Sequence, residues 1–441
     1  MTPTTSTGRP QRVVILGGGF AGIIAARTLR NAPVEITLID RTNHHLFQPL
    51  LYQVATAVLA PSDITSPIRH LLRSQQNTTV LMAEARGIDV NRRVVTIDEG
   101  REIPYDYLIL ATGARHSYFG HDEWERLAPG LKSIDDAQDI RRRFLLAFER
   151  AEKCLDPEEQ TAHLTFVVIG AGPTGVELAG MIPEIAREGM RPEFRNVDTR
   201  RTRVLLLEGA PRVLLTFPEH LSERAQRDLE ALGVEVRTKA LVTKIEPGSV
   251  WLGEERIRTH TVLWGAGNAA SPLSRSLGVP LDRAGRVLVQ PDMSIPGHPE
   301  VFVAGDVAAA VWKDNVMVPG VAPAANQMGR LAAENLLRTL KGEPRKALRY
   351  TDKGNLATIG RNKAVADFGK LRVAGRMAWF LWLFVHILYL VGFRNRISVL
   401  SQWIYAFATY RRAARLIDNA EKYMTPPAAP PAARSPAPPR S

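Results

Sequence analysis

Cysteine is nearly absent from this chain of 441 residues, in which Cys154 is the only one. A single thiol cannot form a disulfide framework, a dithiol redox pair or a cysteine-ligated metal centre. The sequence therefore predicts no metal site and a reducing, cytosol-facing compartment. An apolar signal-peptide core is also missing, because the N-terminus reads MTPTTSTGRPQR, so export by that route is not expected.

Acidic residues are scarce in the last fifth of the chain. Residues 345–441 contain 17 Lys and Arg but only 4 Asp and Glu, a local charge of +13, which leaves about −1 for residues 1–344. A nucleic-acid partner would explain a basic segment. Here the arginines flank apolar aromatic residues, and this pattern favours an anionic membrane surface over nucleic acid.

Charge is missing altogether from one stretch, MAWFLWLFVHILYLVGF at 377–393. Its 17 residues reach only the lower limit of a membrane span, roughly 17–25 residues. His386 near its centre and Gly392 near its end weaken the spanning alternative. The following segment, 397–417, repeats apolar residues at helical spacing and continues into Arg411, Arg412 and Arg415.

The apolar positions of that following segment are Ile397, Leu400, Ile404, Phe407 and Ala408. Two adjacent helices of this kind predict an anchor over 377–417 that lies on an anionic membrane surface. Contact of the first helix with a second copy of the chain is the alternative, and both can hold in a dimeric peripheral protein.

A strand, a glycine-rich turn and an alanine-rich helix occur in this order twice. The first copy is RVVILGGGFAGIIAARTL at 12–29 and the second is LTFVVIGAGPTGVELAGMI at 164–182. Two such openings about 150 residues apart predict two doubly wound nucleotide-binding domains. The expected fold class is therefore α/β, with two Rossmann-like domains and a C-terminal helical region.

The first glycine motif is Gly17-x-Gly19-x-x-Gly22. The first glycine permits a tight turn, the second lets the backbone approach a pyrophosphate, and the third lets helix and strand pack closely. Asp40 follows 18 residues after Gly22, at the end of the next strand, where it can accept a hydrogen bond from a ribose hydroxyl. Strand, helix and acid together predict a dinucleotide site.

The second glycine motif is Gly170-x-Gly172-x-x-Gly175, and Glu208 ends the next strand. The interval of 33 residues from Gly175 exceeds the usual value of about 20, and the segment REGMRPEFRNVDTRR accounts for the extra length. A carboxylate here favours the free 2′-hydroxyl of NADH and repels the phosphate of NADPH. Arg212 could favour NADPH, although a solvated loop charge is the simpler interpretation.

Two dinucleotide sites in one chain are most economically explained by hydride transfer between two cofactors, a flavin and a nicotinamide. Asp306 supports this interpretation, because it ends the buried strand EVFVAGDVA and could hold the ribityl side of a flavin. Capping of the following helix is the alternative role for Asp306, and both roles can hold.

The chain resembles the flavoproteins with two dinucleotide-binding domains, through both glycine motifs, ATG at 111–113 and AGD at 304–306. A subfamily is indicated by NHHLFQPLLYQVA (43–55), GAGPTGVELAGMIPEIA (170–186), VPGVAPAANQMGRLAAENL (318–336) and WLFVHILYLVGFRNR (382–396). These segments resemble type II NADH:quinone oxidoreductases, which are single-subunit respiratory dehydrogenases that pump no protons. The missing second cysteine disfavours disulfide reductases and sulfide:quinone oxidoreductases.

The resemblance implies non-covalent FAD in the first domain, NADH in the second and a membrane quinone as electron acceptor. FAD would contact Gly17, Gly19, Phe20, Ala21, Gly22, Asp40, Ala111, Thr112, Gly113, Asp306 and Ala322. NADH would contact Gly170, Gly172, Thr174, Gly175, Glu177, Glu208 and Gly267. The resemblance also implies that Glu177 is catalytic near the flavin–nicotinamide contact; the sequence alone shows a helix carboxylate two residues after Gly175.

The expected quinone side departs from the family pattern, which commonly runs Ala-Gln-x-Ala-x-Gln. Residues 322–327 read APAANQ, so that Gln327 keeps the second glutamine, implied to be catalytic, while Pro323 replaces the first. Proline is favoured in the first turn of a helix, so a helix from about 323 to 340 is expected. One amide that could bind a quinone carbonyl is lost, and Pro323, Ala324 and Gln327 remain as the quinone-side residues.

The expected domains are a loose 1–10, an FAD domain made of 11–125 and 290–350, an NADH domain with a connecting helix at 126–289, a membrane-anchoring domain at 351–423 and a disordered Pro/Ala-rich 424–441. The expected state is a homodimer, peripheral on the cytoplasmic face of the cell membrane.

Two other functions stay open because Pro323 replaces the first glutamine of the family pattern. One is reduction of a soluble electron-transfer protein, and the other is a membrane-associated NADH redox sensor with little turnover.

Overall fold

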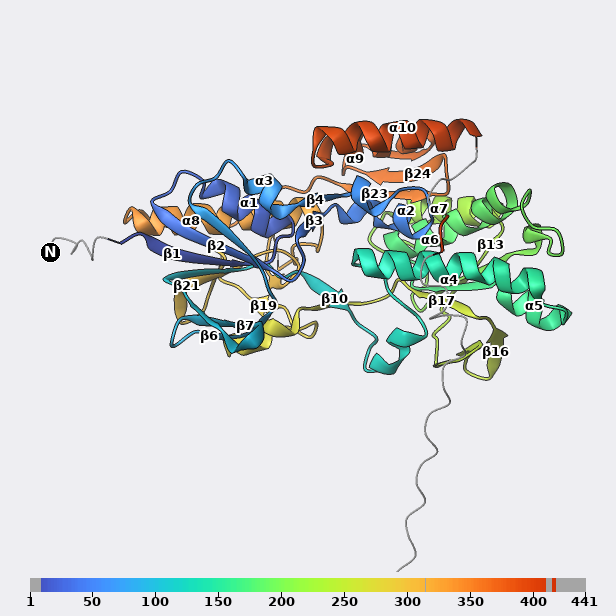
Figure 1. Ribbon diagram of the computed structural model, residues 1–441, viewed down its shortest axis with the longest axis horizontal. Helices are drawn as coiled ribbons and strands as arrows, with labels where there is room; N and C mark the ends of the chain where they lie inside the picture. Colours follow the sequence, from blue (N-terminus) through green and yellow to red (C-terminus); the bar gives the residue numbers. More distant parts are fainter. Residues whose placement is uncertain (1–8, 314, 410–414, 418–441) are drawn as a thin grey trace, which may run out of the picture.

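Figure 1 shows the computed structural model, which describes residues 9–313, 315–409 and 415–417. The expected N-terminal arm and Pro/Ala-rich tail lie almost entirely outside these ranges. Two α/β domains lie side by side, and a C-terminal unit lies above the second domain in this view.

The first domain is built on a six-stranded sheet in the order β20-β21-β9-β1-β2-β5. Its strands are β1 (Gln11–Leu16), β2 (Val34–Asp40), β5 (Thr78–Met82), β9 (Tyr107–Leu110), β20 (Ser294–Ile295) and β21 (His298–Val303). The last four residues of β1 are all buried, as expected for a central parallel strand covered on both faces.

Two long helices of this domain pack against each other, α1 (Phe20–Thr28) and α8 (Ala322–Leu340). They approach so closely that a Cβ on Gly329 would lie 2.3 Å from the carbonyl oxygen of Ala21. The remaining elements are α2 (Leu51–Ala55), α3 (Ile68–Leu72), β3 (His44–Leu46), β4 (Thr65–Pro67), β6 (Ala85–Asp89), β7 (Val94–Ile97), β8 (Glu102–Pro104), β19 (Val287–Leu288) and β22 (Ala308–Ala309).

The second domain contains a parallel four-stranded sheet in the order β13-β12-β11-β17. Its strands are β11 (Thr165–Ile169), β12 (Arg203–Glu208), β13 (Val234–Thr238) and β17 (Thr261–Trp264). Its helices are α4 (Ile134–Lys153), α5 (Pro157–His163), α6 (Pro173–Glu184) and α7 (Glu219–Ala231). A small antiparallel sheet is formed by β14 (Lys244–Glu246), β15 (Ser249–Leu252) and β16 (Glu255–Arg258).

The chain passes between the two domains along β10 (Ala114–His116) and returns along β18 (Asn268–Ala270), and these two strands pair antiparallel. The return comes earlier than the expected boundary at 290. Leu273, Leu277 and Val287 pack in the core of the first domain, because the apolar side chains of this segment complete that core.

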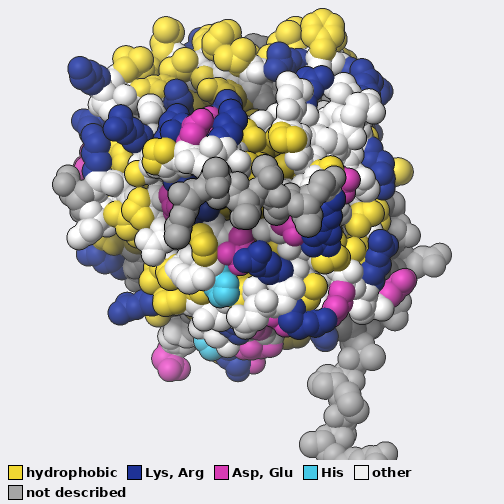
Figure 2. Space-filling view, turned by 90° about the vertical axis from the view of Figure 1, so that its left-hand side faces the viewer, with side chains coloured by type: hydrophobic (Ala, Val, Ile, Leu, Met, Phe, Trp, Pro, Cys, Tyr) yellow, Lys and Arg dark blue, Asp and Glu magenta, His cyan; other side chains and the backbone are white. Residues whose placement is uncertain are grey.

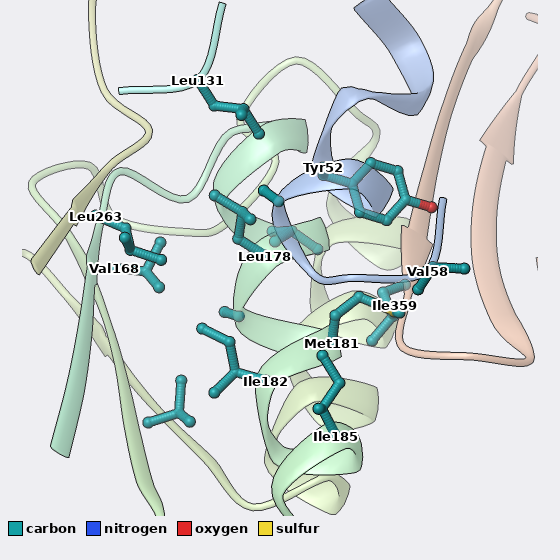
Figure 3. Packing of buried hydrophobic residues seen from close by; sticks show 14 of the residues in the cluster. Tyr52, Val58, Leu131, Val168, Leu178, Met181, Ile182, Ile185, Leu263 and Ile359 are labelled. Carbon is teal, nitrogen blue, oxygen red and sulfur yellow. The ribbon is translucent and has the colours of Figure 1, made fainter. Parts of the chain in front are cut away.

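The C-terminal unit is a three-stranded antiparallel sheet covered by two helices. The strands are β23 (Asn355–Ile359), β24 (Lys363–Asp367) and β25 (Arg372–Gly375), followed by α9 (Arg376–Tyr389) and α10 (Phe393–Thr409). Its apolar residues join the core of the second domain, and Figure 3 shows Tyr52 from α2 and Ile359 from β23 beside α6 in that core. None of the helices within residues 9–313 and 315–409 is long and apolar enough to cross a bilayer.

Candidate active site

The first glycine motif forms a tight turn between β1 and α1. Gly17 has φ +106°, and a Cβ on it would lie 2.3 Å from the carbonyl oxygen of Ala111. A Cβ on Gly22 would lie 1.8 Å from the carbonyl oxygen of Gly17. A Cβ on Gly19, in contrast, would meet nothing within 4 Å. The fold itself requires the first and third glycines, whereas the second is needed only where another molecule approaches the backbone.

This turn opens into a cavity of about 580 Å³ at the carboxyl ends of the first-domain strands. Ten of the predicted FAD residues line the cavity, namely Gly17, Gly19, Phe20, Ala21, Asp40, Ala111, Thr112, Gly113, Asp306 and Ala322. The eleventh, Gly22, packs behind the turn. Parts of the sequence nearly 300 residues apart therefore meet at one site, as the glycine motif and the AGD segment predicted.

The chemistry of the cavity fits an FAD molecule. The hydroxyl of Thr112 is buried without a hydrogen-bond partner, and the N-terminus of α1 has no side-chain cap. Donors in such positions are suited to phosphate and hydroxyl oxygens. Lys132 and Asp306 attract each other across the cavity wall; burial lowers the pKa of Lys132 and raises the pKa of Asp306.

Asp40 shapes the glycine turn as well as lining the cavity. Its Oδ2 accepts the backbone N–H of Gly18 at 2.6 Å, and its Oδ1 accepts both the backbone N–H and the hydroxyl of Thr42 at 2.7 Å. These bonds fix the carboxylate at the end of β2, where one of its faces still borders the cavity.

The second glycine motif repeats this geometry between β11 and α6. Gly170 has φ +93°, and a Cβ on it would lie 2.6 Å from the backbone nitrogen of Ala266. A Cβ on Gly175 would lie 1.8 Å from the carbonyl oxygen of Gly170, whereas a Cβ on Gly172 would meet nothing within 4 Å. The N-terminus of α6 again has no side-chain cap, and Thr174 lies half-buried in its first turn.

Glu208 occupies the place in this motif that Asp40 has in the first. Its Oε2 accepts the backbone N–H of Ala171 at 2.6 Å, and its Oε1 accepts that of Ala210 at 2.8 Å. Arg212 points elsewhere, because its guanidinium donates to the carbonyl oxygens of Leu214, Leu215 and Phe217. This supports the simpler interpretation of Arg212 as a loop residue.

Gly267 lies where β17 leads back to the first domain. It has φ +68°, and a Cβ on it would lie 2.7 Å from the ring of Phe119 and from the carbonyl oxygen of Ser117. Packing alone therefore requires a glycine here, which makes Gly267 a weaker marker of a ligand than Gly172.

Glu177 lies on α6 two residues after Gly175, the last glycine of the motif. Its side chain is partly exposed, although it lies deep among protein atoms. Burial raises the pKa of Glu177 well above its usual value, and a hydrogen bond from the Thr358 backbone acts in the opposite direction. The carboxyl group therefore favours its protonated form.

The predicted helix on the quinone side is α8, which starts at Ala322 and has Pro323 in its first turn. Ala324 is fully buried in the core, so its side chain cannot face a ligand. The amide of Gln327 is engaged in both directions with Thr351: its Nε2 donates to the carbonyl oxygen and its Oε1 accepts the backbone N–H, each at 2.9 Å. Gln327 thus ties α8 to the start of the C-terminal unit.

Helices α9 and α10 expose one apolar face each. The exposed residues recur at helical spacing and are Met377, Phe380, Phe384 and Leu388 on α9 and Phe393, Ile397, Leu400 and Ile404 on α10. Phe384 and Ile404 keep 63% and 62% of their surface exposed. Figure 2 shows apolar side chains beside Lys and Arg along the upper edge, where these helices lie in Figure 1.

The inner face of α10 combines two buried apolar side chains, Val399 and Trp403, with polar ones. The hydroxyl of Ser398 donates to Asp63 at 2.8 Å, and Gln402 donates to the same carboxylate at 2.9 Å. The side chains of Phe407 and Ala408, with residues 411 and 412, lie outside the described part of the chain. Arg415, expected near lipid, forms an ion pair with Glu193 at 2.6 Å.

One group of side chains in the described ranges has the spacing of metal ligands, namely Glu159, His163 and His260. The two imidazoles stack with ring centroids 4.3 Å apart, and His260 Nε2 lies 2.6 Å from Glu159. Arg258 lies 2.8 Å from the other oxygen of Glu159. Because a guanidinium already neutralises the carboxylate, we assign this group as an ion-pair cluster.

Several cavity residues were not found by sequence reasoning. Lys132 and the segments 83–85 and 271–273 line the cavity without belonging to any motif. Cys154 directly follows α4 and donates to the carbonyl oxygen of Asp156.

Comparison with known proteins identifies the family. Residues 11–329 match the family described as pyridine nucleotide-disulphide oxidoreductase, and residues 353–412 match the NDH2 C-terminal domain. The type II NADH:quinone oxidoreductase Ndh of Mycobacterium tuberculosis is 44% identical over 436 residues, which cover 96% of this chain and 93% of that protein. The chain belongs to the type II NADH:quinone oxidoreductases.

More distant members of the family agree with this assignment. The type II NADH:quinone oxidoreductase of Haemophilus influenzae is 27% identical over 411 residues, covering 85% of this chain and 92% of that protein. The structure of Plasmodium falciparum NDH2 in complex with NADH superposes with a TM-score of 0.83 at 20% identity, covering 90% of this chain and 98% of that one. As a type II NADH:quinone oxidoreductase, the chain is an FAD- and NADH-dependent oxidoreductase.

Proposed function

We propose that this type II NADH:quinone oxidoreductase passes electrons from NADH to a membrane quinone. FAD binds at the turn formed by the first glycine motif, Gly17–Gly22, here called the first cradle. NADH binds at the turn formed by the second motif, Gly170–Gly175, the second cradle. The observation that carries the assignment of the cofactors is the open space at Gly19 and at Gly172, in two turns whose other glycines are required by packing. When bound, FAD supplies the ability to take up a hydride and release its electrons singly or in pairs.

The residues of the first cradle have distinct tasks. The backbone around Gly19 and the N-terminus of α1 hold the pyrophosphate, and Asp40 holds the turn in shape and borders the ribose. Thr112 and Lys132 offer hydrogen-bond donors to oxygen atoms of the same molecule, and Asp306 accepts from its hydroxyl groups.

The residues of the second cradle select and orient NADH. Glu208 presents a carboxylate to the adenosine ribose, where it accepts from a free 2′-hydroxyl and repels a 2′-phosphate. Burial raises the pKa of Glu177 and so favours its protonated form, beside the place where the two cofactors meet. A proton kept there in a desolvated site is available when a quinone takes up two electrons and two protons.

On the quinone side we assign Pro323 to shape the first turn of α8 and Gln327 to hold the chain at Thr351 against that helix. Helices α9 and α10, each with an exposed apolar face, seat the enzyme on the cytoplasmic face of the membrane as a homodimer. Exposed aromatic side chains beside arginines favour the interface of an anionic bilayer.

Turnover with different acceptors tests this function. The purified enzyme should oxidise NADH rapidly with a short-chain quinone, and anionic vesicles should be needed for rapid oxidation with a long-chain quinone. Rapid reduction of a small iron–sulfur protein without quinone activity would favour the soluble-acceptor alternative. Slow turnover with every acceptor would favour the sensor alternative.

Membrane seating is tested by replacement of Phe384 with Glu. Because a buried Phe contributes about 2 kcal/mol, Phe384→Glu should weaken binding to anionic vesicles more than about tenfold and leave activity with short-chain quinone unchanged. Leu155→Glu is the matched control, since Leu155 is 97% exposed but lies away from α9 and α10. Equal vesicle binding by Phe384→Glu and the unaltered enzyme in sedimentation would contradict the proposed membrane-binding surface on α9 and α10.

Analytical ultracentrifugation of the purified enzyme tests whether it is a homodimer, and a monomer would contradict that assignment.

A further inference from the structure

A continuous set of buried hydrogen bonds joins α10 to the strand beside Glu177. The indole N–H of Trp403 donates to Gln53 Oε1 at 2.6 Å, and Gln53 Nε2 donates to the hydroxyl oxygen of Tyr52 at 3.0 Å. The hydroxyl of Tyr52 lies 3.0 Å from Thr358 Oγ1. All four side chains are at least nine-tenths buried. Each bond therefore forms in a low-dielectric environment, where successive bonds reinforce one another.

The direction of these bonds follows from the amide of Gln53. Its oxygen accepts from Trp403 and its nitrogen donates to Tyr52, so the orientation of the amide is fixed. The phenol oxygen of Tyr52 accepts this bond and also shares a hydrogen bond with the hydroxyl of Thr358, in which either oxygen can be the donor. The bonds thus run without a break from α10 through α2 to β23.

Thr358 is the residue whose backbone hydrogen-bonds the carboxyl group of Glu177. The two segments are in close contact: a Cβ on Gly180, one turn further along α6, would lie 2.6 Å from the backbone nitrogen of Gly360. Figure 3 shows the hydroxyl of Tyr52 directed toward β23, with Ile359 of that strand lying between it and Met181 of α6. A displacement of β23 would therefore also displace α6, because no space is left between them.

We propose that Tyr52 is a positioning residue, which fixes the carboxyl group of Glu177 through Thr358. Gln53 and Trp403 extend this control to α10, so that the seating of the membrane-side helix and the position of the buried carboxyl are coupled. The inference rests on the role proposed above for Glu177, and it adds residues that no motif of the sequence marks.

The hydrogen-bonded set formed by Trp403, Gln53, Tyr52 and Thr358 borders a pocket. A pocket lies between α6, α9 and α10, and Tyr52, Gln53, Trp382 and Trp403 contribute to its wall. The indole N–H of Trp382 is buried there without a hydrogen-bond partner. Aromatic packing joins this side chain to the network, because the ring of Trp382 lies 5.4 Å from Trp403 and 6.4 Å from Tyr52. A shift of α9 relative to α10 would therefore also change the hydrogen bonds of Trp403 and Tyr52.

Infrared spectroscopy of the FAD-loaded enzyme tests the proposal without turnover. The carboxyl band of protonated Glu177 is assigned by its disappearance in Glu177→Gln. Tyr52→Phe and Thr358→Val, which each remove one oxygen, should shift this band. Tyr118→Phe is the matched control, because it also removes a buried tyrosine hydrogen bond of 3.0 Å, to Ala128, in another part of the protein. An unmoved band in Tyr52→Phe would overturn the proposal.

A double-mutant cycle gives the second measurement, the rate at which NADH bleaches the flavin. Loss of one hydrogen bond in Tyr52→Phe should slow this rate roughly 2- to 10-fold. In the Glu177→Gln background the same change should have no further effect, since Tyr52 acts through Glu177. The proposal would be overturned if the effects of the two substitutions on the bleaching rate multiplied independently. It would also be overturned if NADH bleached the flavin of Glu177→Gln as fast as that of the unaltered enzyme. Thermal unfolding of each variant separates these effects from loss of the fold.

The two proposals can fail separately. Flavin bleaching requires no quinone, so an unaltered enzyme that is bleached by NADH but ignores every quinone would contradict the proposed function alone. Additive effects in the cycle would contradict the role of Tyr52 alone and leave NADH:quinone turnover standing.

Discussion

In both glycine cradles the carboxylate that ends the next strand accepts the backbone N–H of the residue after the first glycine. Asp40 accepts from Gly18 and Glu208 from Ala171, each at 2.6 Å. What surrounds the two cradles differs. The first opens into a cavity of about 580 Å³, to which Lys132 and the start of α8 contribute. At the second, Gly209 is exposed and the neighbouring Leu241 keeps 72% of its surface exposed.

This difference explains how one local motif can serve two kinds of ligand. A site enclosed by segments from several parts of the chain retains its ligand, because release requires all of them to move. A site on an open edge exchanges its ligand at each turnover. The glycine motif therefore determines that a dinucleotide binds, and the surrounding segments determine whether it stays.

The largest expected effect comes from adding one methyl group at the open position of each cradle. Gly19→Ala should give an enzyme purified without flavin and without activity. Gly172→Ala should retain its flavin and show an NADH KM raised at least about tenfold, the equivalent of roughly 1.4 kcal/mol. Flavin absorbance and steady-state kinetics measure both. Equal flavin loss in the two variants would show that the cradles are not specialised as proposed.

A smaller effect is expected from the carboxylate of the second cradle. Glu208→Gln removes the negative charge that repels a 2′-phosphate, so the preference for NADH over NADPH should fall about tenfold in kcat/KM. Asp40→Asn is the control from the first cradle and should leave this preference unchanged. An unchanged preference in Glu208→Gln would contradict the proposed place of the ribose.

The smallest effect concerns pH. The folded protein raises the pKa of Glu177, so the folded state binds more protons than the unfolded state between the two pKa values. The stability contributed by this proton is present below the unfolded pKa and is lost as pH rises toward the folded one. Relative to the unaltered enzyme, the Tm of Glu177→Gln should therefore increase with pH, by about 1–2 °C. A Tm difference that is constant from acid to alkaline pH would show that folding leaves the pKa of Glu177 unchanged.

The sequence predicted those features whose signal is local. Glycine spacing located both cradles, Pro323 indicated the start of α8, the charge-free run at 377–393 located α9, and helical spacing located the apolar face of α10. These patterns work because each is imposed by a backbone turn or by the period of a helix.

The features that escaped prediction depend on contacts between distant segments. Lys132 reaches the cavity from the segment before α4, Gln327 is paired with Thr351, and Asp63 receives its hydrogen bonds from α10. The boundary near Ala270 was placed too late because the residues that follow complete a core begun 250 residues earlier. A local sequence pattern does not predict which distant residue will form a hydrogen bond with a buried polar group.

The central claim is that a retained flavin in the first cradle accepts electrons from NADH in the second and gives them to a quinone. Stopped-flow absorbance of the purified enzyme tests it most directly, with NADH in one syringe and a short-chain quinone present or absent. We predict rapid bleaching of the flavin by NADH and recovery at a comparable rate only when quinone is present. Bleaching that quinone fails to reverse would contradict electron transfer to quinone.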